Sequence, residues 1–296
     1  MAPNRLARPV SIVSTVVLVM VLAASAISCG QAKQSSDKMG VAVTILPQAE
    51  FAENVAGDKV AITVMVPPGA NPHTTELKPS QMTGIAKAKM YAKVGSGIEF
   101  ELTYMDKIVG INKNMLVVDC SKGIELRASV DPDEPGMDTH IWVSPLNAKI
   151  MVRNICDSLV QVDPANKAYY EQNRDAYLQK LDALDQELRS SLANIKNRAF
   201  IVLHPAWGYF ARDYDLEQIP IEIGGKEPSA QDVARIIDEA KQRNIKIIFA
   251  SPQFNPQMAE VIANETGGRV VLIDPLAKDY IENLHKVLDE MVQAME

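Results

Sequence analysis

Basic residues are in the minority in this chain of 296 residues, which carries 30 Lys and Arg against 37 Asp and Glu. Nucleic-acid binding needs clustered Lys and Arg facing the phosphates, so the acidic balance argues against a nucleic-acid partner. The same balance is mildly favourable for cations. Glycine and proline are not abundant either, and 47% of the residues are hydrophobic. This composition is typical of an ordinary globular protein with enough core for two domains.

Cysteine is scarce, with three in the whole chain. Cys120 and Cys156 fall in the same predicted lobe and could form a disulfide in an oxidising compartment, but two buried thiols are an equally open interpretation. The third, Cys29, stands at the end of an apolar N-terminal segment. We therefore consider Cys29 separately, as a site of modification.

The N-terminal segment has the features of a secretory signal. Arg5 and Arg8 precede a charge-free run over residues 9–32, and a basic start followed by an apolar centre predicts a signal peptide over residues 1–28. A transmembrane anchor is the alternative, but the run is short for a bilayer span. The run ends in Ala26-Ile27-Ser28-Cys29, which resembles the lipobox of bacterial lipoproteins.

These features predict an extracytoplasmic protein, anchored to the bacterial membrane on the periplasmic side or at the cell surface through a lipid on Cys29. Residues 29–40 are mostly polar and would form a flexible tether. Removing residues 1–28 deletes two arginines and no acidic residue, so the formal charge changes from −7 to −9.

Strand-like and helix-like segments alternate through the rest of the chain. Near-continuous apolar runs, such as residues 60–66 and 200–203, are typical of buried parallel strands, and amphipathic segments follow them. Such alternation predicts α/β lobes with parallel sheets. We assign residues 41–162 to an N-terminal lobe and residues 198–296 to a C-terminal lobe.

Between the lobes, residues 164–197 contain no glycine and no proline after Pro164. Leucines recur there at steps of three and four residues, which is the period of a helix. Asp163 is a plausible N-cap, and Pro164 suits the first helical position. A coiled-coil dimerisation helix is the alternative, but the apolar seam lacks sustained heptads. We expect residues 163–197 to form a rigid helix that joins the lobes of a monomer.

The candidate site residues lie where predicted strands end. His73 follows the strand at 60–66, His204 directly follows 200–203, and Asp274 directly follows 270–273. His140 follows an acidic loop. In open α/β sheets ligands bind beyond the carboxyl ends of the strands.

These four residues include two from each lobe, so facing lobes could bring them together. Three neutral imidazoles and one carboxylate suit a borderline divalent ion, Zn²⁺ first. Each histidine alone could equally be a loop residue bonded to nearby backbone. The remaining histidine, His285, lies on the polar face of the last predicted helix, where we expect no metal-binding role.

The residues around the histidines resemble the motifs of one family. The matching segments are Asn71-Pro72-His73, Asp138-Thr139-His140-Ile141-Trp142-Val143-Ser144-Pro145, Leu203-His204-Pro205-Ala206-Trp207-Gly208-Tyr209-Phe210, Gly97-Ile98-Glu99-Phe100-Glu101, Lys226-Glu227-Pro228-Ser229 and Val271-Leu272-Ile273-Asp274-Pro275-Leu276. They resemble the zinc- and manganese-binding lipoproteins of bacterial ABC importers, which are solute-binding proteins of family 9. The resemblance covers essentially the whole chain after the signal segment.

The resemblance implies two α/β lobes joined by one backbone helix, with a divalent metal held by His73, His140, His204 and Asp274 and delivered to an ABC permease. Histidine at the third ligand position accompanies zinc binders in that family, and glutamate accompanies manganese binders, so His204 favours zinc. Many zinc-binding members carry a His-rich loop before the second motif, whereas residues 127–139 contain no histidine. Mn²⁺ or Fe²⁺ therefore remains an alternative.

Two other classes of function need to be weighed. A zinc hydrolase needs an open coordination position with a general base beside it, but the chain contains no HExxH, and a fourth protein ligand would close the site. We therefore expect no enzyme activity. The second class is a surface adhesin lipoprotein, for which the sequence offers no repeat or other supporting feature.

Overall fold

The computed structural model describes residues 38–129, 136–222 and 227–295, together with Met1. Contacts divide the chain into a unit over Met1–Asp37 and a compact unit over Lys38–Glu296. The predicted signal peptide, Cys29 and most of the tether lie outside the described residues. No helix in the described part of the chain is both long and apolar enough to span a membrane.

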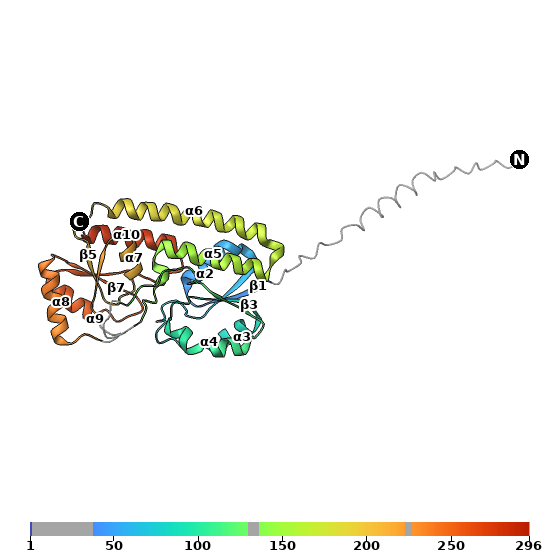
Figure 1. Ribbon diagram of the computed structural model, residues 1–296, viewed down its shortest axis with the longest axis horizontal. Helices are drawn as coiled ribbons and strands as arrows, with labels where there is room; N and C mark the ends of the chain where they lie inside the picture. Colours follow the sequence, from blue (N-terminus) through green and yellow to red (C-terminus); the bar gives the residue numbers. More distant parts are fainter. Residues whose placement is uncertain (2–37, 130–135, 223–226, 296) are drawn as a thin grey trace. The chain divides into compact units, whose positions relative to one another are not determined.

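The N-terminal lobe is built on a four-stranded parallel sheet with the order β2-β1-β3-β4. Its strands are β1 (Met39–Val43), β2 (Val60–Val64), β3 (Ala88–Lys93) and β4 (Leu116–Asp119). Its helices are α2 (Leu46–Ala56), α3 (Pro79–Lys87), α4 (Glu99–Ile111) and α5 (Pro145–Val162). Helices α2 and α5 cover one face of the sheet and α3 and α4 the other (Figure 1). Single turns of 3₁₀ helix lie at Gly57–Lys59, Ile141–Val143 and Pro164–Asn166.

The C-terminal lobe repeats this plan with a second four-stranded parallel sheet of order β6-β5-β7-β8. Its strands are β5 (Ala199–Val202), β6 (Glu217–Pro220), β7 (Ile247–Ala250) and β8 (Arg269–Leu272). Its helices are α7 (Gly208–Asp213), α8 (Ala230–Gln242), α9 (Gln257–Thr266) and α10 (Tyr280–Met295). The α/β fold with two parallel sheets, predicted from the alternation of apolar runs and amphipathic segments, is confirmed.

The long linking helix exists but is shorter than predicted. Helix α6 spans Lys167–Leu192, and Pro164–Asn166 form a separate 3₁₀ turn. Asp163 does not cap α6 as expected, because its φ of −144° and ψ of 70° place it before the 3₁₀ turn. The helix also ends before residue 197. Arg198 donates hydrogen bonds to the carbonyls of Leu192 and Tyr214, which ties the end of α6 to the C-terminal lobe.

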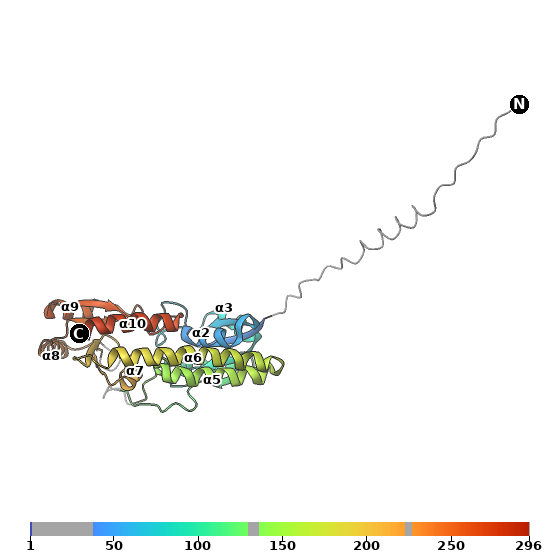
Figure 2. The ribbon, with the colours of Figure 1, turned by 90° about the horizontal axis from the view of Figure 1, so that it is seen from above.

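Helix α6 contacts elements of both lobes. It packs against α5 and α2 of the N-terminal lobe and against α10 of the C-terminal lobe, and Figure 2 shows it running between α5 and α10. The predicted leucine stripe is buried, together with two tyrosines: Tyr170, Tyr177, Leu178, Leu181, Leu184, Leu188 and Leu192. This helix therefore shares one apolar seam with both lobes.

Direct contacts between the lobes add to this connection. Trp142 donates its indole N–H to the Pro275 carbonyl at 2.7 Å, and Tyr280 donates its hydroxyl to the Trp142 carbonyl at 2.8 Å. Trp142 lies two residues after His140, and Pro275 directly follows Asp274. The two lobes thus meet through satisfied buried polar groups as well as apolar packing.

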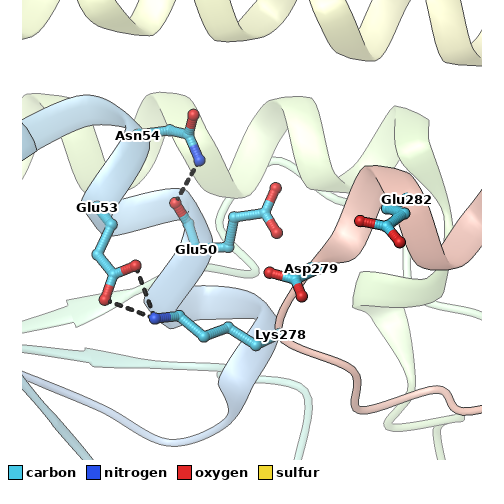
Figure 3. Close-up of a pocket in the computed structure, with 6 residues that line it drawn as sticks. All are labelled: Glu50, Glu53, Asn54, Lys278, Asp279 and Glu282. Carbon is cyan, nitrogen blue, oxygen red and sulfur yellow. Dashed lines mark hydrogen bonds and ion pairs between the residues drawn. The ribbon is translucent and has the colours of Figure 1, made fainter.

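A second inter-lobe contact joins α2 to the start of α10 (Figure 3). Glu50 accepts hydrogen bonds from the Tyr177 hydroxyl and the Tyr280 backbone N–H, and Lys278 forms an ion pair with Glu53 at 2.9 Å. These groups border a hollow of about 310 Å³ lined by Glu50, Glu53, Asn54, Lys278, Asp279 and Glu282. Burial raises the pKa of Glu50 above its ordinary value, although the hydrogen bonds from Tyr177 and Tyr280 oppose this.

Three further sequence expectations can be compared with the structure. Cys120 and Cys156 are both free and buried, so the disulfide alternative is wrong and the alternative of two buried thiols is right. The position of Ser144 before Pro145, and that of Ser229 before an amphipathic segment, are typical of N-caps, and in the structure Ser144 caps α5 and Ser229 caps α8. The predicted strands at 60–66, 200–203 and 270–273 end one or two residues earlier in the structure, at Val64, Val202 and Leu272. The residues beyond these ends still donate backbone hydrogen bonds to the adjacent segments.

Candidate metal centre

His73 reaches the site from the loop that follows β2. Asn71 shapes this loop, because its side-chain oxygen accepts the His73 backbone N–H at 2.8 Å and its carbonyl accepts the N–H groups of Thr74 and Thr75. The Nδ1 atom of His73 lies 2.7 Å from a carboxylate oxygen of Glu99, the first residue of α4. Its Nε2 atom is buried and has no hydrogen-bond partner.

His140 lies directly before the 3₁₀ turn Ile141–Val143. One carboxylate oxygen of Asp138 accepts a hydrogen bond from the His140 backbone N–H at 3.0 Å. The Nδ1 atom of the His140 ring lies 3.0 Å from the same oxygen. Tyr209 of α7 fixes the same segment from the opposite lobe, since its hydroxyl donates to the Asp138 carbonyl and accepts the Arg127 backbone N–H. His140 is therefore held by both lobes.

His204 lies just beyond β5, separated from its last residue by Leu203, whereas the sequence predicted that it follows the strand directly. Its Nδ1 atom lies 2.7 Å from a carboxylate oxygen of Glu222, which follows β6. One face of its ring stacks on Phe254, with ring centroids 4.3 Å apart and planes 21° apart. The ring is thus fixed both along its edge and across its face.

The three histidines converge on one point. The Nε2 atoms of His140 and His204 are 3.2 Å apart, and the ring centroids of His73 lie 5.8 Å and 5.0 Å from those of His140 and His204. One ligand atom from each ring can be chosen so that all lie within 4.8 Å of one another. This is the group of side chains in the described residues that could hold a metal ion.

Asp274, the fourth residue expected from the sequence, does not join this group. It lies beyond β8, where one carboxylate oxygen accepts hydrogen bonds from the side-chain amide of Gln253 at 2.8 Å and from the Leu276 backbone N–H at 2.9 Å. The structure thus brings three of the four predicted ligands together. His285 lies on α10, where its Nδ1 atom is 3.4 Å from a carboxylate oxygen of Glu187 of α6.

The surroundings of His204 favour its neutral imidazole. Burial, reinforced by the nearby rings of His140 and His73, holds the pKa of His204 well below its ordinary value of 6.5. Burial alone would raise the pKa of Glu99, but the contact with His73 outweighs it and the pKa is lowered. These shifts favour the neutral form of His204, which is the form that binds a metal, and the ionised form of Glu99.

Sequence reasoning did not assign a role to the residues that hold the rings. Glu99 and Asp138 stand within segments that resemble family motifs, but their contacts with the histidines were not predicted. Glu222 and Phe254 carried no signal, because they lie 18 and 50 residues beyond His204 and meet it only through the fold. The contact that could have been predicted from the sequence is that of Asp138, because an aspartate two residues before His140 readily accepts a hydrogen bond from its backbone N–H.

A family model described as ZnuA, zinc-uptake complex component A, periplasmic, matches residues 41–294. The chain is 30% identical over 260 residues to the high-affinity zinc uptake system protein ZnuA of Bacillus subtilis (strain 168), covering 83% of this chain and 81% of the relative.

Among solved structures, a crystal structure of ZnuA is 40% identical with a TM-score of 0.84, covering 88% of this chain and 100% of that one. The laminin-binding protein of Streptococcus agalactiae, described as bifunctional with adhesin and metal-transporting activity, is 26% identical with a TM-score of 0.78, covering 88% of this chain and all of that one. The family match spans both lobes and the loops that carry the three histidines. The chain therefore belongs to the family of periplasmic component A proteins of zinc-uptake complexes.

Proposed function

We propose that this protein captures Zn²⁺ outside the cytoplasm and delivers it to an ABC permease in the membrane. The observation that carries the proposal is the 3.2 Å separation of the His140 and His204 Nε2 atoms. Two nitrogens that each lie 2.0–2.1 Å from a tetrahedral zinc ion would be about 3.3 Å apart. The Nε2 atom of His73, buried without a partner, supplies a third nitrogen.

The fourth ligand in this proposal is Asp274. Its carboxylate lies just beyond β8, as His204 lies just beyond β5, and the hydrogen bond from Gln253 holds one of its two oxygens. Rotation towards the histidines would complete a set of three nitrogens and one oxygen, which suits tetrahedral zinc. Such a closed set leaves no coordination position for a substrate, so we expect no hydrolase activity.

Metal analysis of protein purified without added metal is the direct test, with competition among Zn²⁺, Mn²⁺ and Fe²⁺ carried out alongside. We expect one equivalent of zinc and a preference for zinc over the other two ions. Loss of bound zinc in His140→Ala and His204→Ala, with retention in His285→Ala, would place the ion at the proposed centre. Stoichiometric Mn²⁺ or Fe²⁺ in place of zinc would favour the alternative of a manganese or iron importer component.

We further propose that the protein is a monomer tethered to the membrane by lipid on Cys29. The basis is the N-terminal sequence, in which Arg5 and Arg8 precede an apolar run that ends in a lipobox-like segment. A tether of polar residues after Cys29 would leave the metal centre free to reach the permease.

An adhesin role is the second candidate, favoured by the similarity to the laminin-binding protein of Streptococcus agalactiae. The two roles predict different growth phenotypes for a strain from which the protein has been deleted. Zinc import requires that the deletion strain grow poorly in metal-poor medium and recover when zinc is added. An adhesin alone would leave growth unchanged and reduce binding to laminin-coated surfaces.

A further inference from the structure

Each histidine of the metal centre contacts a carboxylate of its own. The Nδ1 atom of His73 lies 2.7 Å from a carboxylate oxygen of Glu99, and that of His140 lies 3.0 Å from Asp138. The Nδ1 atom of His204 lies 2.7 Å from Glu222. The three acids come from different elements, namely the start of α4, the segment before the 3₁₀ turn Ile141–Val143, and the exit of β6. One shared arrangement thus recurs at three separate places in the fold.

We infer that Glu99, Asp138 and Glu222 are positioning residues that hold the three rings with Nδ1 protonated and Nε2 turned towards the metal. The inference rests on the proposed zinc-binding function and names residues that act through the ligands. An ionised carboxylate can only accept hydrogen bonds, so the Nδ1 atom facing it must be the donor. In a neutral ring the lone pair is then on Nε2, which is the atom a metal can bind.

The Nε2 atoms are placed as this assignment requires. Those of His140 and His204 face each other at 3.2 Å, and that of His73 is buried without a partner. Unprotonated nitrogens this close repel unless a cation lies between them. A shared divalent ion accounts for both features, because it accepts a lone pair from each ring.

The fold supports the carboxylates in turn. The second oxygen of Asp138 accepts a hydrogen bond from Arg127, and the Asp138 N–H donates to the Arg127 carbonyl at 2.9 Å. A side chain at Gly208, the first residue of α7, would collide with the Arg127 guanidinium and the Asp138 carboxylate. Glycine at this position therefore permits the close approach that keeps Asp138 against His140.

The start of α4 is supported in a similar way. Glu101 is buried and accepts the backbone N–H groups of Val94 and Gly95 together with the Thr44 hydroxyl. These contacts attach the first turn of α4 to the carboxyl ends of β1 and β3. Glu99, two residues earlier, is thereby aimed at His73.

The three pairs differ in their access to solvent. The side chain of Glu99 is 45% exposed, whereas those of Asp138 and Glu222 are 7% and 17% exposed. The Glu99 oxygen that faces His73 is buried and makes only an ion-pair contact with it, whereas the Asp138 and Glu222 oxygens form hydrogen bonds with their histidines. We therefore expect the loss of Asp138 or Glu222 to weaken zinc binding more than the loss of Glu99.

The test compares removal of each acceptor with its conservative replacement. Glu222→Ala, Asp138→Ala and Glu99→Ala remove the acceptor, whereas Glu222→Gln, Asp138→Asn and Glu99→Gln keep a neutral oxygen. Loss of an outer-shell partner typically lowers metal affinity about 10- to 100-fold, and we expect that loss in the alanine variants with partial rescue in the amide variants. Asp106→Ala, a carboxylate change on the exposed side of α4, is the matched control and should leave zinc affinity unchanged.

A spectroscopic measurement on the wild-type protein keeps the inference testable if a variant fails to fold. Nitrogen-15 NMR of the histidine rings in the zinc-loaded protein should show three rings bound through Nε2 and protonated at Nδ1. Zinc coordination through Nδ1, or alanine variants that fold and bind zinc like the wild type, would overturn the inference. Failure of the wild-type protein to bind zinc would instead overturn the proposed function.

Discussion

The Nε2 atoms of His140 and His204 lie 3.2 Å apart although 64 residues separate them along the chain. Each ring is held by a carboxylate from its own side, Asp138 for His140 and Glu222 for His204. This distance is maintained by the packing of two lobes against each other, so the centre can form only in the folded protein. Metal binding and folding are therefore coupled.

Zinc should stabilise the folded protein for this reason. A ligand that binds only the folded state at about 1,000 times its Kd adds about 4.1 kcal/mol to the free energy of unfolding. We expect the melting temperature to rise with zinc concentration in the wild type and the rise to be lost in His204→Ala. Thermal unfolding with and without zinc measures the effect, and a melting temperature insensitive to zinc would contradict the proposed centre.

His204→Glu should change the preference among metals. Histidine offers one borderline nitrogen, whereas glutamate offers hard oxygens that Mn²⁺ favours. The replacement also brings a further negative charge beside Glu222. We expect the ratio of zinc affinity to manganese affinity to fall, while zinc still binds more tightly in absolute terms. Competition titrations measure this ratio, and an unchanged ratio would remove the main sequence support for zinc.

Glu50 should make stability depend on pH. Its pKa is raised by burial above the ordinary value of 4.5, so above that pH the folded state binds more protons than the unfolded state. The free energy of unfolding then falls as the pH rises from the unfolded pKa through the folded pKa. Glu50→Gln does not titrate, and the stability of the wild type relative to this variant should therefore decrease with rising pH. Melting temperatures across that range test this, and a difference that grows would reverse the assignment.

Metal uptake should move the lobes by small tilts only. Helix α6 contains neither glycine nor proline and contacts both lobes, so it offers no obvious hinge. Small-angle scattering curves of metal-free and zinc-loaded protein should nearly superimpose. A large contraction on adding zinc would mean that the lobes close around the ion despite this helix.

Cys29→Ala should abolish lipid attachment, because the thiol is the only group in the lipobox-like segment that can carry the lipid. We expect the variant to lose metabolic labelling with a fatty acid and to be retained less by the membrane. Cys120→Ala, a change at a buried free thiol, is the matched control and should label normally. Equal labelling of the Cys29 variant would exclude the lipobox assignment.

Several features of the fold could be predicted because the chain carries them locally. Apolar runs followed by amphipathic segments predict parallel strands covered by helices. Ser144 and Ser229 stand directly before the helices that they cap, at positions where serine is typical. The bounds of α6 could not be predicted with the same accuracy. Pro164 is as compatible with a 3₁₀ turn as with an α-helix. At the far end of the helix, Arg198 donates hydrogen bonds to the carbonyls of Leu192 and Tyr214, and the second of these contacts forms only in the folded C-terminal lobe.

The sequence by itself determined which residues are candidates for the metal centre, since His73 and His204 follow strands and ligands bind where parallel strands end. Only the tertiary structure decided how these side chains meet. Glu222 and Phe254 hold His204 from segments with no motif of their own, and Asp274 accepts a hydrogen bond from Gln253 and does not join the three rings. Local patterns indicate a strand end to within one or two residues, because apolar runs depend on near neighbours in the chain. The contacts between side chains at a sheet edge depend on how the two lobes pack, and they leave no periodic signal along the chain.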